Sequence, residues 1–180
     1  MININSLLEQ KAEKLLIESN SYSTPVQLTQ CAKYLGITVK NVELDADVSG
    51  FLLLKDDNTV HIGINKSNPT NRKRFTLAHE IAHFVLHAKD SKLFVDKEEK
   101  VLYRDANSST GELAKEREAN AFAAALLMPE KLLCEEIGKQ KEEAKEKFIT
   151  NLAKKFQVSE QAITIRLTNL GLIDYSAFAS

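Results

Sequence analysis

Two histidines and a glutamate occur together near the middle of this 180-residue chain, in the segment HEIAH at residues 79–83. An α-helix turns about 100° and rises about 1.5 Å per residue, so His79 and His83 would share nearly one face, where both imidazoles can bind one metal ion. Burying the ionised Glu80 beside them is costly without a cation, whereas a zinc ion and its bound water satisfy all three groups. This HExxH spacing is typical of zinc hydrolases, in which the glutamate is the general base.

His87 is the next histidine along the same segment, but helix geometry argues against it as a third ligand. Residues 74–87 contain no glycine or proline, so the helix should continue through Leu86. His87 then lies about 12 Å along the axis from His79, and one ion at about 2.1 Å from each nitrogen cannot reach both. We therefore expect that His87 is not itself a metal ligand. It should either support a residue that is a ligand or have a structural role.

The third protein ligand is expected from another helix, because a carboxylate usually completes the pair of histidines in this motif. Residues 112–129 begin as a charged helix and become rich in alanine, a composition that lets two helices approach closely. Glu116 and Asn120 share one face, so Glu116 can reach the metal while Asn120 hydrogen-bonds a ligand. Glu118 is the competing carboxylate, and since it is rotated by about 200° from Glu116, one of the two should face solvent.

At these two segments the chain resembles the ImmA/IrrE metallopeptidases. The resemblance rests on RFTLAHEIAHF at residues 74–84 and EREANAFAAALLMP at residues 116–129, which are similar to the family's signatures in order and spacing. Weaker similarities extend it over about residues 7–173.

The resemblance implies a zincin-like metallopeptidase core with two zinc-binding helices. It implies ligation of zinc by His79, His83 and Glu116, with Glu80 as catalytic base. The sequence itself leaves manganese open as the native metal. Several family members cleave a helix-turn-helix repressor so that its regulon is released, often in a stress response or on a mobile element. The implied function is thus an endopeptidase whose partner is a protein substrate of this kind.

The surrounding elements predict an α+β fold in which a small sheet backs the helix that contains the histidines. Two helices should precede the sheet. The expected strands are residues 37–44, 50–55 and 59–64, of which the last two form a hairpin. In similar zinc peptidases an exposed strand edge receives the substrate backbone, and this hairpin is the expected place for it.

Residues 88–111 show no convincing periodicity and carry several charges, so they predict a long loop between the two metal-binding helices. Loops of this length are usually functional or mobile. Tyr103 and Arg104 could donate hydrogen bonds to a transition-state oxyanion there, although ordinary loop packing is the simpler interpretation.

Residues 129–180 are expected to form a helical extension packed on a metallopeptidase domain of residues 1–128. Within it, residues 152–163 have the pattern of a helix-turn-helix in which Ser159 caps the second helix. That helix offers few cations for phosphate contact, so we expect packing or substrate docking rather than direct DNA binding. The competing hypothesis is a non-catalytic, zinc-containing regulator that binds DNA or a partner protein through these helices. A pure scaffold, however, has no need of the base Glu80.

Composition agrees with one compact unit, since 43% of the residues are hydrophobic and the net charge is −1. A charge this small gives no general attraction to nucleic acid or to a membrane surface. The first residues lack the features of a signal peptide, and no stretch approaches the ~20 apolar residues that cross a bilayer. Cys31 and Cys134 form no CxxC pattern and are expected to be reduced. Together these features predict a cytoplasmic protein.

Overall fold

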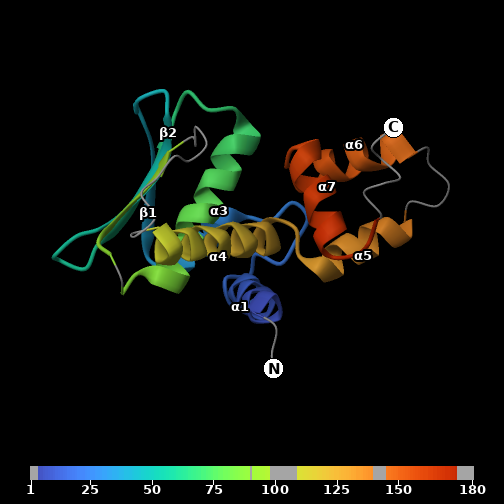
Figure 1. Cartoon of the computed structure of the whole chain (residues 1–180), viewed down its shortest axis with the longest axis horizontal. Helices are drawn as coiled ribbons and strands as arrows, with labels where there is room; N and C mark the ends of the chain where they lie inside the picture. Colours follow the sequence, from blue (N-terminus) through green and yellow to red (C-terminus); the bar gives the residue numbers. More distant parts are fainter. Residues whose placement is uncertain (1–3, 90, 98–108, 140–144, 174–180) are drawn as a thin grey trace.

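The computed structural model describes residues 4–89, 91–97, 109–139 and 145–173, which form seven helices and four strands (Figure 1). This confirms the predicted α+β fold. The helices are α1 (Ile4–Glu18), α2 (Leu28–Tyr34), α3 (Thr70–His87), α4 (Ser109–Leu127), α5 (Glu130–Lys139), α6 (Lys145–Phe156) and α7 (Glu160–Asn169). The strands are β1 (Ile37–Val42), β2 (Val48–Leu54), β3 (Val60–Asn65) and β4 (Leu93–Lys97).

The strands form one mixed sheet in the order β1-β3-β2-β4. β1 runs parallel to β3, whereas β2 is antiparallel to both of its neighbours, β3 and β4. The β2–β3 hairpin therefore lies inside the sheet, and the prediction that it offers an exposed edge is wrong. The reason is that β1 and β4, which are distant in the sequence, each cover one side of the hairpin.

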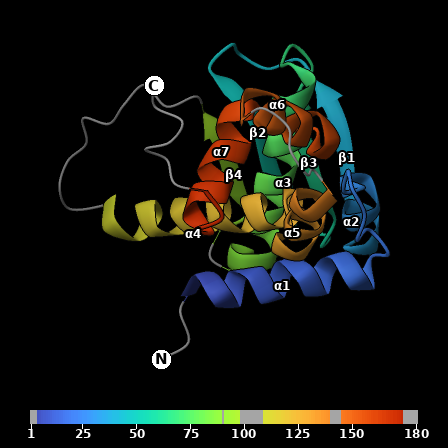
Figure 2. The same ribbon diagram turned by 90° about the vertical axis from the view of Figure 1, so that its right-hand side faces the viewer.

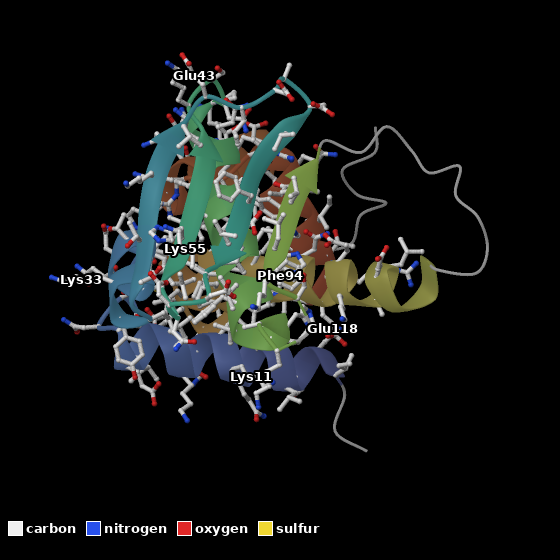
Figure 3. The ribbon with its side chains drawn as sticks, turned by 90° about the vertical axis from the view of Figure 1, so that its left-hand side faces the viewer. Lys11, Lys33, Glu43, Lys55, Phe94 and Glu118 are labelled. Atoms are coloured by element: carbon white, nitrogen blue, oxygen red, sulfur yellow. The ribbon has the colours of Figure 1, made fainter. Side chains whose placement is uncertain are left out.

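β4 also corrects the prediction that residues 88–111 form only a loop. It is a five-residue strand, too short for a clear periodicity, and its backbone is ordered by pairing with β2. Figure 3 shows it at the border of the sheet. Leu93 and Val95 are exposed, whereas Phe94 and Asp96 are partly buried on the side that contacts α3.

α3 lies against one face of the sheet, and α4 crosses α3 (Figure 2). Leu52 and Ile62 of the sheet are buried in one core with Ile81 of α3 and Phe122 of α4. Alanines on the two helices, namely Ala78, Ala82, Ala119 and Ala123, are completely buried. Since alanine has no side chain beyond Cβ, the two backbones can approach closely, and polar side chains on facing turns can meet.

The tail helices α5, α6 and α7 are held to the rest of the fold by polar contacts as well as by the core. Arg166 of α7 is buried, pairs through both terminal nitrogens with the carboxylate of Glu9 on α1, and donates from Nε to the carbonyl of Met128 (3.1 Å). Ser159 caps α7 by accepting from the backbone nitrogen of Ala162 (3.1 Å), as predicted. None of the helices described is both long and apolar enough to cross a membrane.

Candidate metal centre

The structure brings His79, His83 and Glu116 together where α3 and α4 cross. The two histidine Nε2 atoms lie 3.0 Å apart. The Glu116 carboxylate lies 3.3 Å from Nε2 of His79 and 3.1 Å from Nε2 of His83. Ligand atoms about 2.1 Å from one tetrahedral zinc ion are roughly 3.4 Å from each other, so these separations suit a single ion and leave one position open.

Local packing holds the two imidazoles in this arrangement. His79 and His83 are 4% and 2% exposed. The ring of Phe75 stacks on His79 with centroids 6.2 Å apart, and the ring of Phe94 stacks on His83 at 4.7 Å. Because Phe75 precedes His79 by one helical turn while Phe94 comes from β4, both the helix and the sheet restrict the ring orientations.

The Glu116 carboxylate is ionised in this environment. Burial alone would raise its pKa, but hydrogen bonds and charges from His79 and His83 outweigh it and hold the pKa of Glu116 well below the usual value. An ionised carboxylate beside two imidazoles is the donor set that zinc prefers over calcium or magnesium. These residues could therefore hold a zinc ion.

Glu80 is completely buried, and neither of its carboxylate oxygens has a hydrogen-bond partner in the described part of the chain. Burial, and then the charges of Asp96 and Glu116, raise the pKa of Glu80 well above its usual value. An unpartnered carboxyl group buried next to a ligand set is expensive unless a cation or a water molecule satisfies it. This cost is a second indication that the residues present fit a metal centre.

Gly50 of β2 makes room for Glu80 against the sheet. A Cβ atom at position 50 would lie 2.5 Å from Cγ2 of Thr76, 2.8 Å from the carbonyl oxygen of Gly63 and 3.8 Å from Oε1 of Glu80. The first two distances are shorter than van der Waals contact allows. Glycine at this position therefore lets α3 approach β2 closely and places Glu80 between the sheet and the histidines.

His87 is not part of the candidate metal group that the described residues form. It is buried, and its Nε2 atom is 3.6 Å from Oε2 of Glu118. Burial and the neighbouring His83 lower the pKa of His87, which favours its neutral form. Glu118 therefore contacts His87 while its side chain remains 33% exposed. Because α4 crosses α3 at an angle, carboxylates two residues apart on α4 meet histidines on successive turns of α3.

Three further site candidates have different outcomes. Asn120 is exposed, and no hydrogen bond joins it to His79, His83 or Glu116 in the residues that the structure describes. It instead lines a groove beside the metal centre. Tyr103 and Arg104 lie outside the described residues.

Sequence patterns did not reveal a polar cluster between α3 and the two strands that face it. Arg72 donates from Nε and Nη2 to Oγ of Ser49 (3.0 and 2.7 Å), and its Nη2 lies 3.7 Å from the carboxylate of Asp96. Thr76 Oγ1 donates to the same carboxylate (3.3 Å). Spacing offered one signal, because residues 72, 76 and 80 are four apart and share a helix face. Asp96 offered none, since β4 itself was not predicted.

An HExxH helix, a crossing helix that supplies a glutamate, and a small mixed sheet together define a metallopeptidase-type centre. The chain belongs to the IrrE N-terminal-like family, the M78 peptidases, whose model matches residues 32–168. The resemblance noted from the two sequence signatures is thus confirmed.

One solved structure shows how far the fold is shared. A Mycobacterium tuberculosis transcriptional regulator is similar at 20% sequence identity with a TM-score of 0.57. The similarity covers 89% of this chain and 46% of that chain, so the present chain spans about half the length of this structural relative. At this identity the likeness shows the fold alone. No curated protein matches the chain.

Proposed function

We propose that this protein is a zinc-dependent endopeptidase that cleaves a helix-turn-helix transcriptional repressor. The observation that supports the hydrolytic activity is the buried carboxyl group of Glu80, which has no hydrogen-bond partner among the described residues and lies beside the group formed by His79, His83 and Glu116. A purely structural metal site has no use for a carboxyl group that lacks any partner, whereas a hydrolase needs a base there. Membership of the M78 peptidase family supports the same activity.

The protein's own residues divide the chemistry between them. His79, His83 and Glu116 would hold the ion, and Phe75 and Phe94 restrict the imidazole rings. When bound, zinc activates a water molecule and polarises the scissile carbonyl group.

Glu80 would act as the proton carrier. It accepts a proton from the attacking water and then donates it to the nitrogen of the leaving amine. Because its side chain is completely buried, exchange of that proton with bulk solvent is restricted during the reaction.

The substrate backbone is proposed to add to β4 rather than to the β2–β3 hairpin. Within the described residues, no strand pairs with the second edge of β4. This edge lies directly beside the centre, because Phe94 stacks on His83 and Asp96 accepts a hydrogen bond from Thr76. An extended peptide that added there would satisfy the free backbone groups of the strand and would pass close to the ligand group.

A transcriptional substrate is supported by what the chain resembles and by what its tail offers. ImmA/IrrE metallopeptidases include enzymes that cleave repressors, and the solved structure that shares the fold is described as a transcriptional regulator. Direct DNA binding by α7 has less support, because Arg166, its one cation, is buried and pairs with Glu9. The tail is therefore proposed to contact the protein substrate.

The test compares new protein termini in cells that express the wild-type chain or Glu80→Gln. We expect a new amino terminus within one helix-turn-helix repressor, present with the wild type and absent with the variant. Both proteins should contain equal zinc, which excludes metal loss as the cause. Termini that appear equally with both proteins, or none that depend on the wild type, would contradict the proposal.

A further inference from the structure

A groove of about 610 Å³ lies beside the metal centre, between α7 on one side and α3 and α4 on the other. Figure 2 shows α7 next to these two helices. Its apolar lining comes from all three helices and from the turn before α7, and it includes Phe75, Ala121, Ala124, Val158, Ala162 and Ile165.

The groove begins one helical turn from the candidate metal ligands. Phe75, which lines it, stacks on the ring of His79 with centroids 6.2 Å apart. Asn120, which also lines it, follows Glu116 by one turn of α4. A polypeptide that occupies the metal centre therefore has direct access to the groove.

Among the described residues that line the groove, all of the charged ones are cations. They are Arg72, Arg117 and Arg166. Arg166 pairs with Glu9, and Arg72 contacts Ser49 and Asp96. Arg117 is exposed and pairs with no carboxylate in the described ranges. Among the described lining residues, Arg117 is therefore the cation left to pair with an acidic partner.

The groove also leaves apolar surface in contact with solvent. Ile165, on the wall formed by α7, is 49% exposed, and the opposite wall contains the small residues Ala121 and Ala124. A large side chain from a partner would bury itself between these walls, and the removal of apolar surface from water would favour binding.

We propose that this groove is the docking surface for the protein substrate, and that it selects a segment in which a large apolar side chain lies near an acidic one. The apolar side chain packs between Ile165 and the alanines of α4, and the acidic side chain pairs with Arg117. The inference rests on the proposed peptidase function, since docking here places the neighbouring part of the same polypeptide at the metal centre.

The experiment selects binders from a phage-displayed library of random peptides on the immobilised, zinc-loaded Glu80→Gln protein. This variant keeps the groove and does not cut what it binds. We expect enrichment of peptides that combine aspartate or glutamate with leucine, isoleucine or phenylalanine. The dissociation constants of the enriched peptides are then measured on further variants of the same protein by fluorescence anisotropy.

Three variants test whether the enriched peptides bind in the groove. Arg117→Glu should weaken the binding of the acidic peptides by about fivefold. A new selection on this variant should enrich peptides with lysine and arginine instead. Ile165→Ser should weaken them about tenfold through lost apolar contact. Lys33→Glu on α2 changes the charge by the same amount far from the groove and should leave binding unchanged. Circular dichroism and zinc content verify that each variant is folded.

Two results would overturn the inference. The first is a selection that enriches no peptides, or only peptides without acidic residues. The second is that the enriched peptides bind the Arg117→Glu and Ile165→Ser variants with unchanged affinity. Failure of the peptidase function would look different, because binding is measured without turnover. Peptides that bind through the groove while the wild type cleaves no protein would count against the peptidase function alone.

Discussion

Replacement of Gly50 by alanine should separate the sheet from the helix that carries the candidate metal ligands. The added Cβ atom would lie 2.5 Å from Cγ2 of Thr76 and 2.8 Å from the carbonyl oxygen of Gly63. One of these neighbours is a side chain attached to α3, and the other is backbone in the adjacent strand. The first contact is relieved only if α3 moves away from β2 or the Thr76 side chain rotates, and the second only if β2 and β3 shift relative to each other. Glu80 lies one turn further along the same helix face.

The cost follows from overpacking of a buried contact. Inserting a methyl group into a packed interior typically costs about 1–3 kcal/mol. For a domain of this size each kcal/mol lowers the melting temperature by roughly 2–4 °C, so Gly50→Ala should melt about 2–12 °C below the wild type. Thr76→Ser removes Cγ2 and keeps the hydroxyl group that donates to Asp96. The double variant Gly50→Ala/Thr76→Ser should recover part of the lost stability, because only the clash with the carbonyl oxygen of Gly63 remains.

The assay is thermal unfolding followed by circular dichroism on metal-free protein. Gly138→Ala is the matched control, because a Cβ atom there meets nothing within 4 Å. It lies within α5, so the same substitution should be neutral or should stabilise the protein by up to about 1 kcal/mol. Equal stability of Gly50→Ala and wild type, or no coupling between Gly50→Ala and Thr76→Ser, would refute the packing argument.

Three further predictions concern the metal centre and the attachment of the tail. Purified wild-type protein should contain one zinc per chain by elemental analysis. The Glu116→Ala variant should lose the zinc, and the Glu118→Ala variant should keep it. Zinc retained by the Glu116→Ala variant would contradict the proposed ligand set. Glu80→Gln should keep the metal while turnover of a cleaved protein falls at least ~100-fold, and full activity would exclude this residue as the base. Glu9→Gln should destabilise the fold by about 1–3 kcal/mol in urea titration, because it leaves the buried Arg166 without its carboxylate; an unchanged midpoint would show that the pair contributes nothing.

Sequence patterns predicted the parts of the centre that depend on helix periodicity. His79 and His83 are four residues apart and therefore share a face in any α-helix, whatever surrounds it. The same reasoning predicted that His87 is not a metal ligand, and the candidate group among the described residues does not include it. Glu116 was preferred because it shares a face with Asn120, and α4 does bring Glu116 to the histidines, although Asn120 itself is exposed.

Periodicity alone did not predict contacts across the crossing of α3 and α4. Since Glu118 is rotated by about 200° from Glu116, one of the two was expected to face solvent, yet each carboxylate contacts a histidine. The crossing angle decides this contact, and that angle depends on how the alanines of the two helices pack. Arg166 is a similar case, because its position on α7 is compatible with an exposed cation until α1 supplies Glu9 as a partner.

The amino-acid sequence by itself determined the helix that carries the two candidate histidine ligands, the α+β class and the family, because these depend on short motifs and local spacing. Only the tertiary structure decided that β4 forms an edge of the sheet, that Gly50 admits Glu80, and that a cationic groove opens beside the centre. Each of these features joins residues far apart in the chain. Such contacts form only when distant elements bury apolar surface against each other, so no local pattern of residues predicts them.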